Sequence, residues 1–299
     1  MASSFRLGTG FPIKATPLVV ASLLWLAPAS ADIVRPGDPV VGRRDVTYLD
    51  LLKLVVADLD DAQTQDEAKG SQIVAYRHIE GAHARTSPAG PVWINGIEPL
   101  NVHVDGKTRL AILVDLGPSA DGYVAEFSLL ALFDLDARPK LLDVVEVGRD
   151  RETGFAIKPL RPLGGGSDLI LVATSHSDAD ISFDGEELLF ARGDHFQFVA
   201  AFSTFARNDN CKFRLLPDQK VTTSPDPGSP YRRISLVVRE QLSLKPGPAD
   251  CDEEEPPKPF SRVFRSTYRW DSVRQTFATD SKDVEELANE VARENDGQF

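Results

Sequence analysis

Arginine side chains gather near the C-terminal end of a chain that is otherwise acidic. Seven arginines lie between residues 232 and 274, whereas the whole chain carries a formal net charge of −12. In SRVFRSTYRWD, residues 261–271, strand alternation places Arg265, Thr267 and Arg269 on one face. Guanidinium groups suit carboxylates and phosphates, which they hold through paired hydrogen bonds. We interpret Arg239, Arg265 and Arg269 as a candidate binding surface for an envelope protein or an anionic small ligand.

The acidic run DCDEEE, residues 250–255, gives the same arginines a structural interpretation. Its carboxylates lie between the arginines in sequence and offer internal partners for them. Charged faces of sheets are also often simply solvated. At the level of sequence, a binding surface, an internally paired face and a solvated face therefore all remain open.

Oxygen ligands are concentrated in SHSDADISFDGEE, residues 175–187. A calcium loop of the EF-hand type spaces its carboxylates as Asp-x-Asp-x-Asp-Gly, with a glutamate at the twelfth position. Asp178 and Asp180 fit this spacing, but Asp184 comes two residues late and the glutamate is missing. We expect a solvated loop, with a calcium site at Asp178, Asp180 and Asp184 as the alternative.

Standard catalytic patterns are missing from the sequence. It contains no HExxH, no GxSxG and no GxxxxGK[ST] motif. We therefore predict a non-enzymatic binding or interaction protein whose ligand the sequence does not specify. The alternative is a metal-assisted hydrolase with an acidic site around Asp178 and Asp180.

Cys211 and Cys251 are the two cysteines of the chain. In an oxidising compartment an even, small number of cysteines usually forms disulfides. A bond between them would close a loop of forty residues. The chain-entropy model gives such a bond roughly 4 kcal/mol of stabilisation. We predict this disulfide, with two unpaired thiols as the alternative.

The first 31 residues have the pattern of an export signal. Arg6 and Lys14 precede the apolar run LVVASLLWL, which is followed by small residues at Ala29-Ser30-Ala31. The run is too short for a membrane-spanning helix, which needs about 20 apolar residues. We predict cleavage after Ala31 and a periplasmic or secreted chain without an integral membrane segment.

The negative charge of the chain bears on its partners. The two basic residues of the predicted signal peptide would be lost on cleavage, which makes the remaining chain more acidic still. Nucleic acids and anionic membrane surfaces repel an acidic protein. We therefore expect no nucleic acid partner.

The elements that position these residues follow from the apolar pattern. Apolar residues at helical spacing predict a helix at about residues 46–59, with Thr47 as its N-cap and Asp50 three residues later. Three similar strands follow at residues 110–116, 169–175 and 234–240. Each leads into a pair of further strands across a turn.

This weak repeat determines the expected architecture. We predict a mainly β fold of antiparallel meanders, arranged as a sandwich or as part of a propeller. Proline- and glycine-rich segments at residues 158–168 and 222–233 are expected to be surface loops. The predicted organisation is one β-rich domain over residues 32–280, followed by an acidic helix and tail over residues 281–299.

Overall fold

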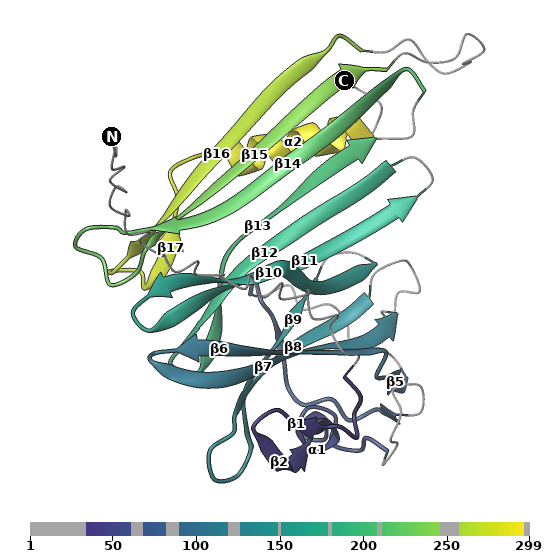
Figure 1. Cartoon of the computed structure of the whole chain (residues 1–299), viewed down its shortest axis with the longest axis vertical. Helices are drawn as coiled ribbons and strands as arrows, with labels where there is room; N and C mark the ends of the chain where they lie inside the picture. Colours follow the sequence, from purple (N-terminus) through teal and green to yellow (C-terminus); the bar gives the residue numbers. More distant parts are fainter. Residues whose placement is uncertain are drawn as a thin grey trace, which may run out of the picture. The chain divides into compact units, whose positions relative to one another are not determined.

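Antiparallel strands dominate the computed structural model, which describes residues 34–60, 68–81, 90–118, 126–148, 151–178, 181–207, 211–245 and 257–295 (Figure 1). One helix lies near each end of this part of the chain, α1 (Tyr48–Leu52) and α2 (Asp283–Asn295). The prediction of a mainly β fold of antiparallel meanders, with an N-terminal and a C-terminal helix, is confirmed.

Three four-stranded meanders follow one another along the chain. The first contains β6 (Gly96–Val104), β7 (Lys107–Pro118), β8 (Glu126–Asp134) and β9 (Lys140–Val147). The second contains β10 (Glu152–Gly164), β11 (Ser167–Asp178), β12 (Ile181–Arg192) and β13 (His195–Arg207). The third contains β14 (Phe213–Ser224), β15 (Arg233–Leu244), β16 (Phe260–Asp271) and β17 (Thr276–Ala278). The three predicted lead strands are β7, β11 and β15, and each has one additional strand before it.

The meanders assemble into two main sheets. The first meander is extended by β4 (Arg77–His78), which pairs parallel to β9 in a five-stranded sheet of order β4-β9-β8-β7-β6. The second and third meanders form an eight-stranded sheet in chain order. A single residue pair, Arg207 with Leu215, joins β13 to β14 in the described part of the chain. The remaining short strands are β1 (Pro39–Val40), β2 (Arg43–Thr47), β3 (Lys69–Gly70) and β5 (Val92–Trp93).

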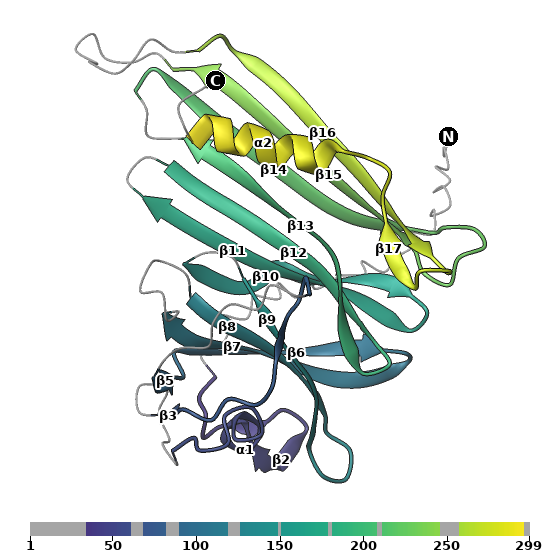
Figure 2. The same ribbon diagram turned by 180° about the vertical axis from the view of Figure 1, so that it is seen from behind.

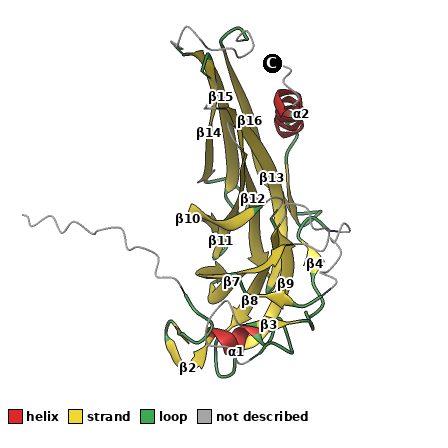
Figure 3. Ribbon diagram, turned by 90° about the vertical axis from the view of Figure 1, so that its right-hand side faces the viewer, coloured by secondary structure: helices red, strands yellow, loops and turns green. Residues whose placement is uncertain are grey.

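One apolar core is shared by the two halves of the eight-stranded sheet. It contains side chains from both halves and from α2, among them Leu188, Phe202, Leu236, Val238, Leu287 and Val291. Figure 2 shows α2 lying across the strands of the third meander, and Figure 3 shows it on one side of them. Side chains of the second and third meanders therefore pack together in one core, to which α2 contributes.

The first meander buries both of its faces. Ile112 and Leu129 pack with Leu51 and Leu52 of α1 in one core. On the opposite face, side chains of β7 and β9 pack against the second meander in another core, to which Leu113, Val145, Ile170 and Leu189 belong. Successive side chains point to opposite faces of a strand, which is how β7 serves both cores.

The N-terminal helix is shorter than the apolar spacing predicted. Thr47 is its N-cap and forms a capping box with Asp50, as expected, but the helix ends at Leu52. Beyond it, the backbone N–H of Ala57 donates to the carbonyl of Gln72, and Val56 forms a β-bridge with Ile73. Pairing with residues 72–74 thus replaces the last turns of the predicted helix.

The first predicted loop is largely strand, and the second is mostly a loop between two strand ends, as predicted. Residues 158–168 contain the end of β10, a turn at Gly165 and Gly166, and the start of β11. Residues 222–233 contain the end of β14 and the first residue of β15. Pro159 lies in the register shift between Phe155 and Leu160, and Pro162 is tolerated because β10 is the edge strand of the sheet.

The stretch 175–187 is a strand pair rather than a solvated loop. β11 runs to Asp178 and β12 begins at Ile181, with Ser175 opposite Asp184. Gly185 lies inside β12, where a Cβ atom would come within 2.7 Å of Thr174 Oγ1. The glycine therefore provides room for close cross-strand packing and does not form a turn.

The described residues from Val34 onward belong to one compact unit. No helix among the described residues has the length and apolar character required to cross a membrane. The predicted signal peptide lies outside the described residues.

Candidate functional site

The candidate site lies on the face of β14–β16 that points away from the shared core, here called the outer face. In β15, Ile234, Leu236 and Val238 are buried, whereas Arg239 is exposed. In β16 the exposed side chains include Arg265, Thr267 and Arg269, as the alternation of the sequence predicted. Their intervening neighbours contribute to the core, which fixes the direction of the arginines.

Three cations surround Val237 on the outer face. Val237 lies directly opposite Lys220 on β14 and opposite Arg265 on β16. Arg239, two residues further along β15, is opposite Asp218 and Val263 and diagonal to both cations. Adjacent and diagonal positions of this kind are roughly 5–8 Å apart. We call Lys220, Arg239 and Arg265 the cation cluster.

The cation cluster lacks close ion pairs among the described residues, although the charge of Arg265 acts on the carboxylate of Asp283. Within the part of the chain that the structure describes, none of its three side chains has a carboxylate within ion-pair distance. Asp218 is the one acidic residue directly opposite a member of the cluster. The predicted internal partners at residues 250–255 lie outside the described residues. Three like charges on one rigid surface repel one another, and an anion bound among them would relieve this repulsion.

Apolar side chains are interleaved with the cations. Val263, opposite Arg239, is 37% exposed, and Leu216 on β14 is 39% exposed. Val237 in the middle of the cluster is partly buried. The outer face therefore presents both charge and apolar contact area, a mixture that is typical of protein interfaces.

Arg269 does not belong to the cation cluster, contrary to the predicted grouping. It lies four residues beyond Arg265, about 13 Å along the strand. Its Nη1 forms an ion pair with Asp226 Oδ1 at 2.7 Å. Lys220, from a strand that was not predicted, takes its place beside Arg239 and Arg265.

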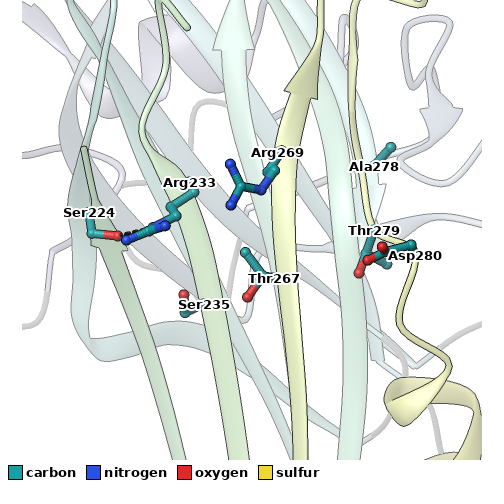
Figure 4. Close-up of a pocket in the computed structure, with 8 residues that line it drawn as sticks. All are labelled: Ser224, Arg233, Ser235, Thr267, Arg269, Ala278, Thr279 and Asp280. Carbon is teal, nitrogen blue, oxygen red and sulfur yellow. Dashed lines mark hydrogen bonds between the residues drawn. The ribbon is translucent and has the colours of Figure 1, made fainter. Parts of the chain in front are cut away.

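Arg269 instead lines a surface cavity at the end of the outer face, here called the arginine pocket (Figure 4). The cavity has a volume of about 610 Å³. It is lined by Ser224, Arg233, Ser235, Thr267, Arg269, Ala278, Thr279 and Asp280. Arg233 Nε donates a hydrogen bond to Ser224 Oγ at 2.8 Å. The pocket thus combines two guanidinium groups, four hydroxyl groups and one carboxylate.

The segment between β17 and α2 fixes one wall of this pocket. The backbone N–H of Arg265 donates to Asp283 Oδ2 at 2.6 Å, and Ser281 Oγ donates to the Arg265 carbonyl at 3.0 Å. The hydrogen bond from Arg265 lowers the pKa of Asp283, which keeps this carboxylate ionised. Thr279 and Asp280, immediately before this anchor, are thereby held beside β16.

A second cavity, of about 390 Å³, contains three carboxylates that the sequence did not single out. Glu98 accepts the backbone N–H of Phe155 at 2.8 Å, and Glu152 accepts the hydroxyl of Ser175 at 3.2 Å. Burial raises the pKa of Asp115, the third carboxyl group. Glu98 thus links the five-stranded sheet to the eight-stranded sheet, and Glu152 links the neighbouring strands β10 and β11.

The predicted metal ligands are only partly described. Asp178 ends β11, Asp180 lies outside the described residues, and Asp184 is half-buried in β12. Burial raises the pKa of Asp184, which disfavours its ionised form. Among the described residues there is no group of three or more histidine, cysteine, aspartate or glutamate side chains arranged for a metal ion. The calcium site remains a prediction.

The predicted disulfide also extends beyond the described part of the chain. Cys211 lies just before β14, and Cys251 is outside the described residues. The bond remains a prediction.

Lys220 and Arg233 are the residues of this face that the sequence analysis missed. Lys220 lies in β14, where every second residue is exposed. This alternation could have predicted the strand and the outward direction of Lys220, and it includes Arg214, Leu216, Asp218, Lys220 and Thr222. Arg233 was counted among the seven arginines but was assigned to a loop. Comparison of the chain with protein-family models, curated proteins and solved structures found no match.

Proposed function

We propose that the chain is an exported, non-enzymatic binding protein of the cell envelope that holds an acidic protein partner on its outer face. The observation that carries the proposal is the cation cluster, in which Lys220, Arg239 and Arg265 have no ion-pair partner among the described residues. Export to the periplasm or beyond the cell is inferred from the signal-like sequence of residues 1–31.

A protein partner accounts for the surface better than a small anion does. The cations are spread over three strands, and the partly exposed Leu216, Val237 and Val263 lie among them. A folded acidic partner would cover these apolar side chains while its carboxylates approach the guanidinium groups. The hydrolase alternative, which depends on Asp178 and Asp180, is not favoured by any contact of the described residues.

Capture from an envelope extract tests the proposal, with the chain lacking residues 1–31 as bait. The test variant is Arg239→Ala with Arg265→Ala. The control is Lys107→Ala with Arg138→Ala, which removes the same charge from exposed positions of the first meander. Captured proteins are identified, purified and titrated against each variant at increasing salt concentrations.

The test variant should bind an acidic partner at least about tenfold more weakly, since arginine is enriched among the few interface residues that contribute most of the binding energy. The control should bind like the unmodified chain. Salt should weaken binding by the unmodified chain more steeply than binding by the test variant, because two charges of the interface are missing. Equal affinity and equal salt dependence of the two would overturn the proposal.

A further inference from the structure

The arginine pocket has a layered arrangement of hydrogen-bonding groups. Thr222, Ser235 and Thr267 face one another in a row across β14, β15 and β16. The next row begins with Ser224 opposite Arg233, and on β16 Arg269 lies opposite Ala278 of β17. A row of hydroxyl groups thus runs beside a row that contains two guanidinium groups.

Each arginine of the pocket has N–H groups without a hydrogen-bond partner among the described residues. A guanidinium group has five N–H donors in a planar fork. Arg233 uses Nε for Ser224, and Arg269 uses Nη1 for Asp226. Figure 4 shows the Arg269 guanidinium directed toward β15, with Thr279 and Asp280 on the other side of β16. Donors therefore lie at one end of the pocket and a carboxylate acceptor at the other.

The charge of the pocket argues against a polyanion. The two positive charges of Arg233 and Arg269 are matched by Asp226, which pairs with Arg269, and by Asp280 in the wall. A ligand that complements this arrangement has a single anionic group for the guanidinium donors. It also has several hydroxyl groups, which exchange hydrogen bonds with the serine and threonine hydroxyls and donate to Asp280.

From these observations we infer that the arginine pocket binds a small sugar that carries one acidic group, either a carboxylate or a phosphate. The cavity volume of about 610 Å³ lies within the range of small-ligand sites. The inference goes beyond the proposed function and does not rest on it, because the acidic partner is assigned to Lys220, Arg239 and Arg265, none of which lines the pocket.

Titration with four probes tests the inference and separates the two sources of the acidic group. Glucuronate supplies a carboxylate on a sugar, glucose 6-phosphate supplies a phosphate on a sugar, glucose is the neutral sugar, and inorganic phosphate lacks the sugar. Binding is followed by calorimetry and by ligand-observed NMR at low salt. At least one of the two acidic sugars should bind saturably and at least tenfold more tightly than both glucose and inorganic phosphate.

Two variants assign the binding to this pocket. Arg233→Ala with Arg269→Ala removes the anion donors. Thr267→Trp keeps both arginines and fills the cavity from an exposed position. Each should abolish saturable binding of the acidic sugar. The second variant keeps the test decisive if the first one folds poorly.

The Arg239→Ala, Arg265→Ala variant should bind the acidic sugar as the unmodified chain does. This result separates the pocket from the partner surface, so either assignment can fail alone. The inference is overturned if neither acidic sugar binds saturably, if glucose or inorganic phosphate binds as tightly as the acidic sugars, or if Thr267→Trp leaves binding unchanged.

Discussion

Glu294 in the last turn of α2 and Glu240 in β15 are both buried carboxyl groups, and the charge of Glu240 disfavours ionisation of Glu294. Glu294 is 1% exposed and Glu240 is 0% exposed. Burial is the larger cause and Glu240 the second, and together they raise the pKa of Glu294 to about 7. Arg262, opposite Glu240, donates to Glu294 Oε1 at 3.1 Å and to Glu290 Oε2 at 2.6 Å. The packing of α2 against the sheet is therefore linked to protonation of the Glu294 carboxyl group.

The stability of the fold should fall as the pH rises from about 4.5 to about 7. The pKa of Glu294 is raised in the folded state, so the folded state binds more protons than the unfolded state in this window, and each pH step lowers the free energy of unfolding. The loss from this group is on the order of 3 kcal/mol. Glu294→Gln should remove it, and chemical denaturation at pH 5 and pH 8 measures the difference.

Glu285→Gln, at an exposed position of the same helix, is the control and should keep the pH dependence of the unmodified chain. Glu294→Gln should therefore be more stable than the unmodified chain at pH 8. An equal loss of stability between pH 5 and pH 8 in Glu294→Gln and in the unmodified chain would show that Glu294 does not carry the linkage.

Leu287 anchors α2 in the shared core, where it is 1% exposed. Leu287→Ala should lower the free energy of unfolding by about 2–4 kcal/mol, because it removes buried apolar contacts and leaves a cavity. Ala288→Ser, at the neighbouring exposed position, should change stability by less than about 0.5 kcal/mol. Thermal or urea denaturation measures both. A similar, small effect of the two substitutions would mean that α2 is not docked through Leu287.

The chain isolated from the exported fraction should begin at Asp32. The small residues Ala29-Ser30-Ala31 follow an apolar run preceded by basic residues, which is the pattern that signal peptidase cleaves. Intact mass and N-terminal sequencing check this prediction. A mass that still includes Met1 to Ala31 would contradict both cleavage and the inferred export.

Cys211 and Cys251 should resist thiol labelling in the denatured, unreduced protein and react after reduction. Cys251→Ser should lower the free energy of unfolding by a few kcal/mol at most, since the bond acts mainly by restricting the unfolded chain. Cys251→Ser measured under reducing conditions, with reduced unmodified protein as reference, controls for the side-chain change itself. Labelling of both cysteines before reduction would show that the bond is absent.

The outward direction of Arg265 and Arg269 was predictable because burial of one side of a strand fixes the direction of every second side chain. Which charged residues of neighbouring strands lie beside these arginines was not predictable. Arg239 lies beside Arg265 because of the register between β15 and β16, and Lys220 joins them through the register with β14. Register depends on how the turns and cores fit together, and the strand pattern alone does not contain that information.

The first helix illustrates a different limit. Val55, Val56 and Leu59 are buried, as their helical spacing suggested, yet they lie beyond the end of α1. Their burial was predictable from their apolar character. Their backbone conformation is decided by hydrogen bonds with residues 72–74, which are distant in the sequence. In β10 the error was the reverse: its prolines and glycines predicted a loop where the chain forms a strand. A shift in the register with β11 makes this strand possible.

The contacts of Ser281 and Asp283 with the backbone of Arg265 have a consequence for the behaviour of the protein at high concentration. The free edge of a sheet exposes N–H and C=O groups onto which a strand of a second molecule can add. Beyond the short β17, these two side chains occupy the donor and the acceptor of Arg265. They interrupt the edge of β16 at its middle, which hinders edge-to-edge association and the growth of aggregates from this side of the sheet.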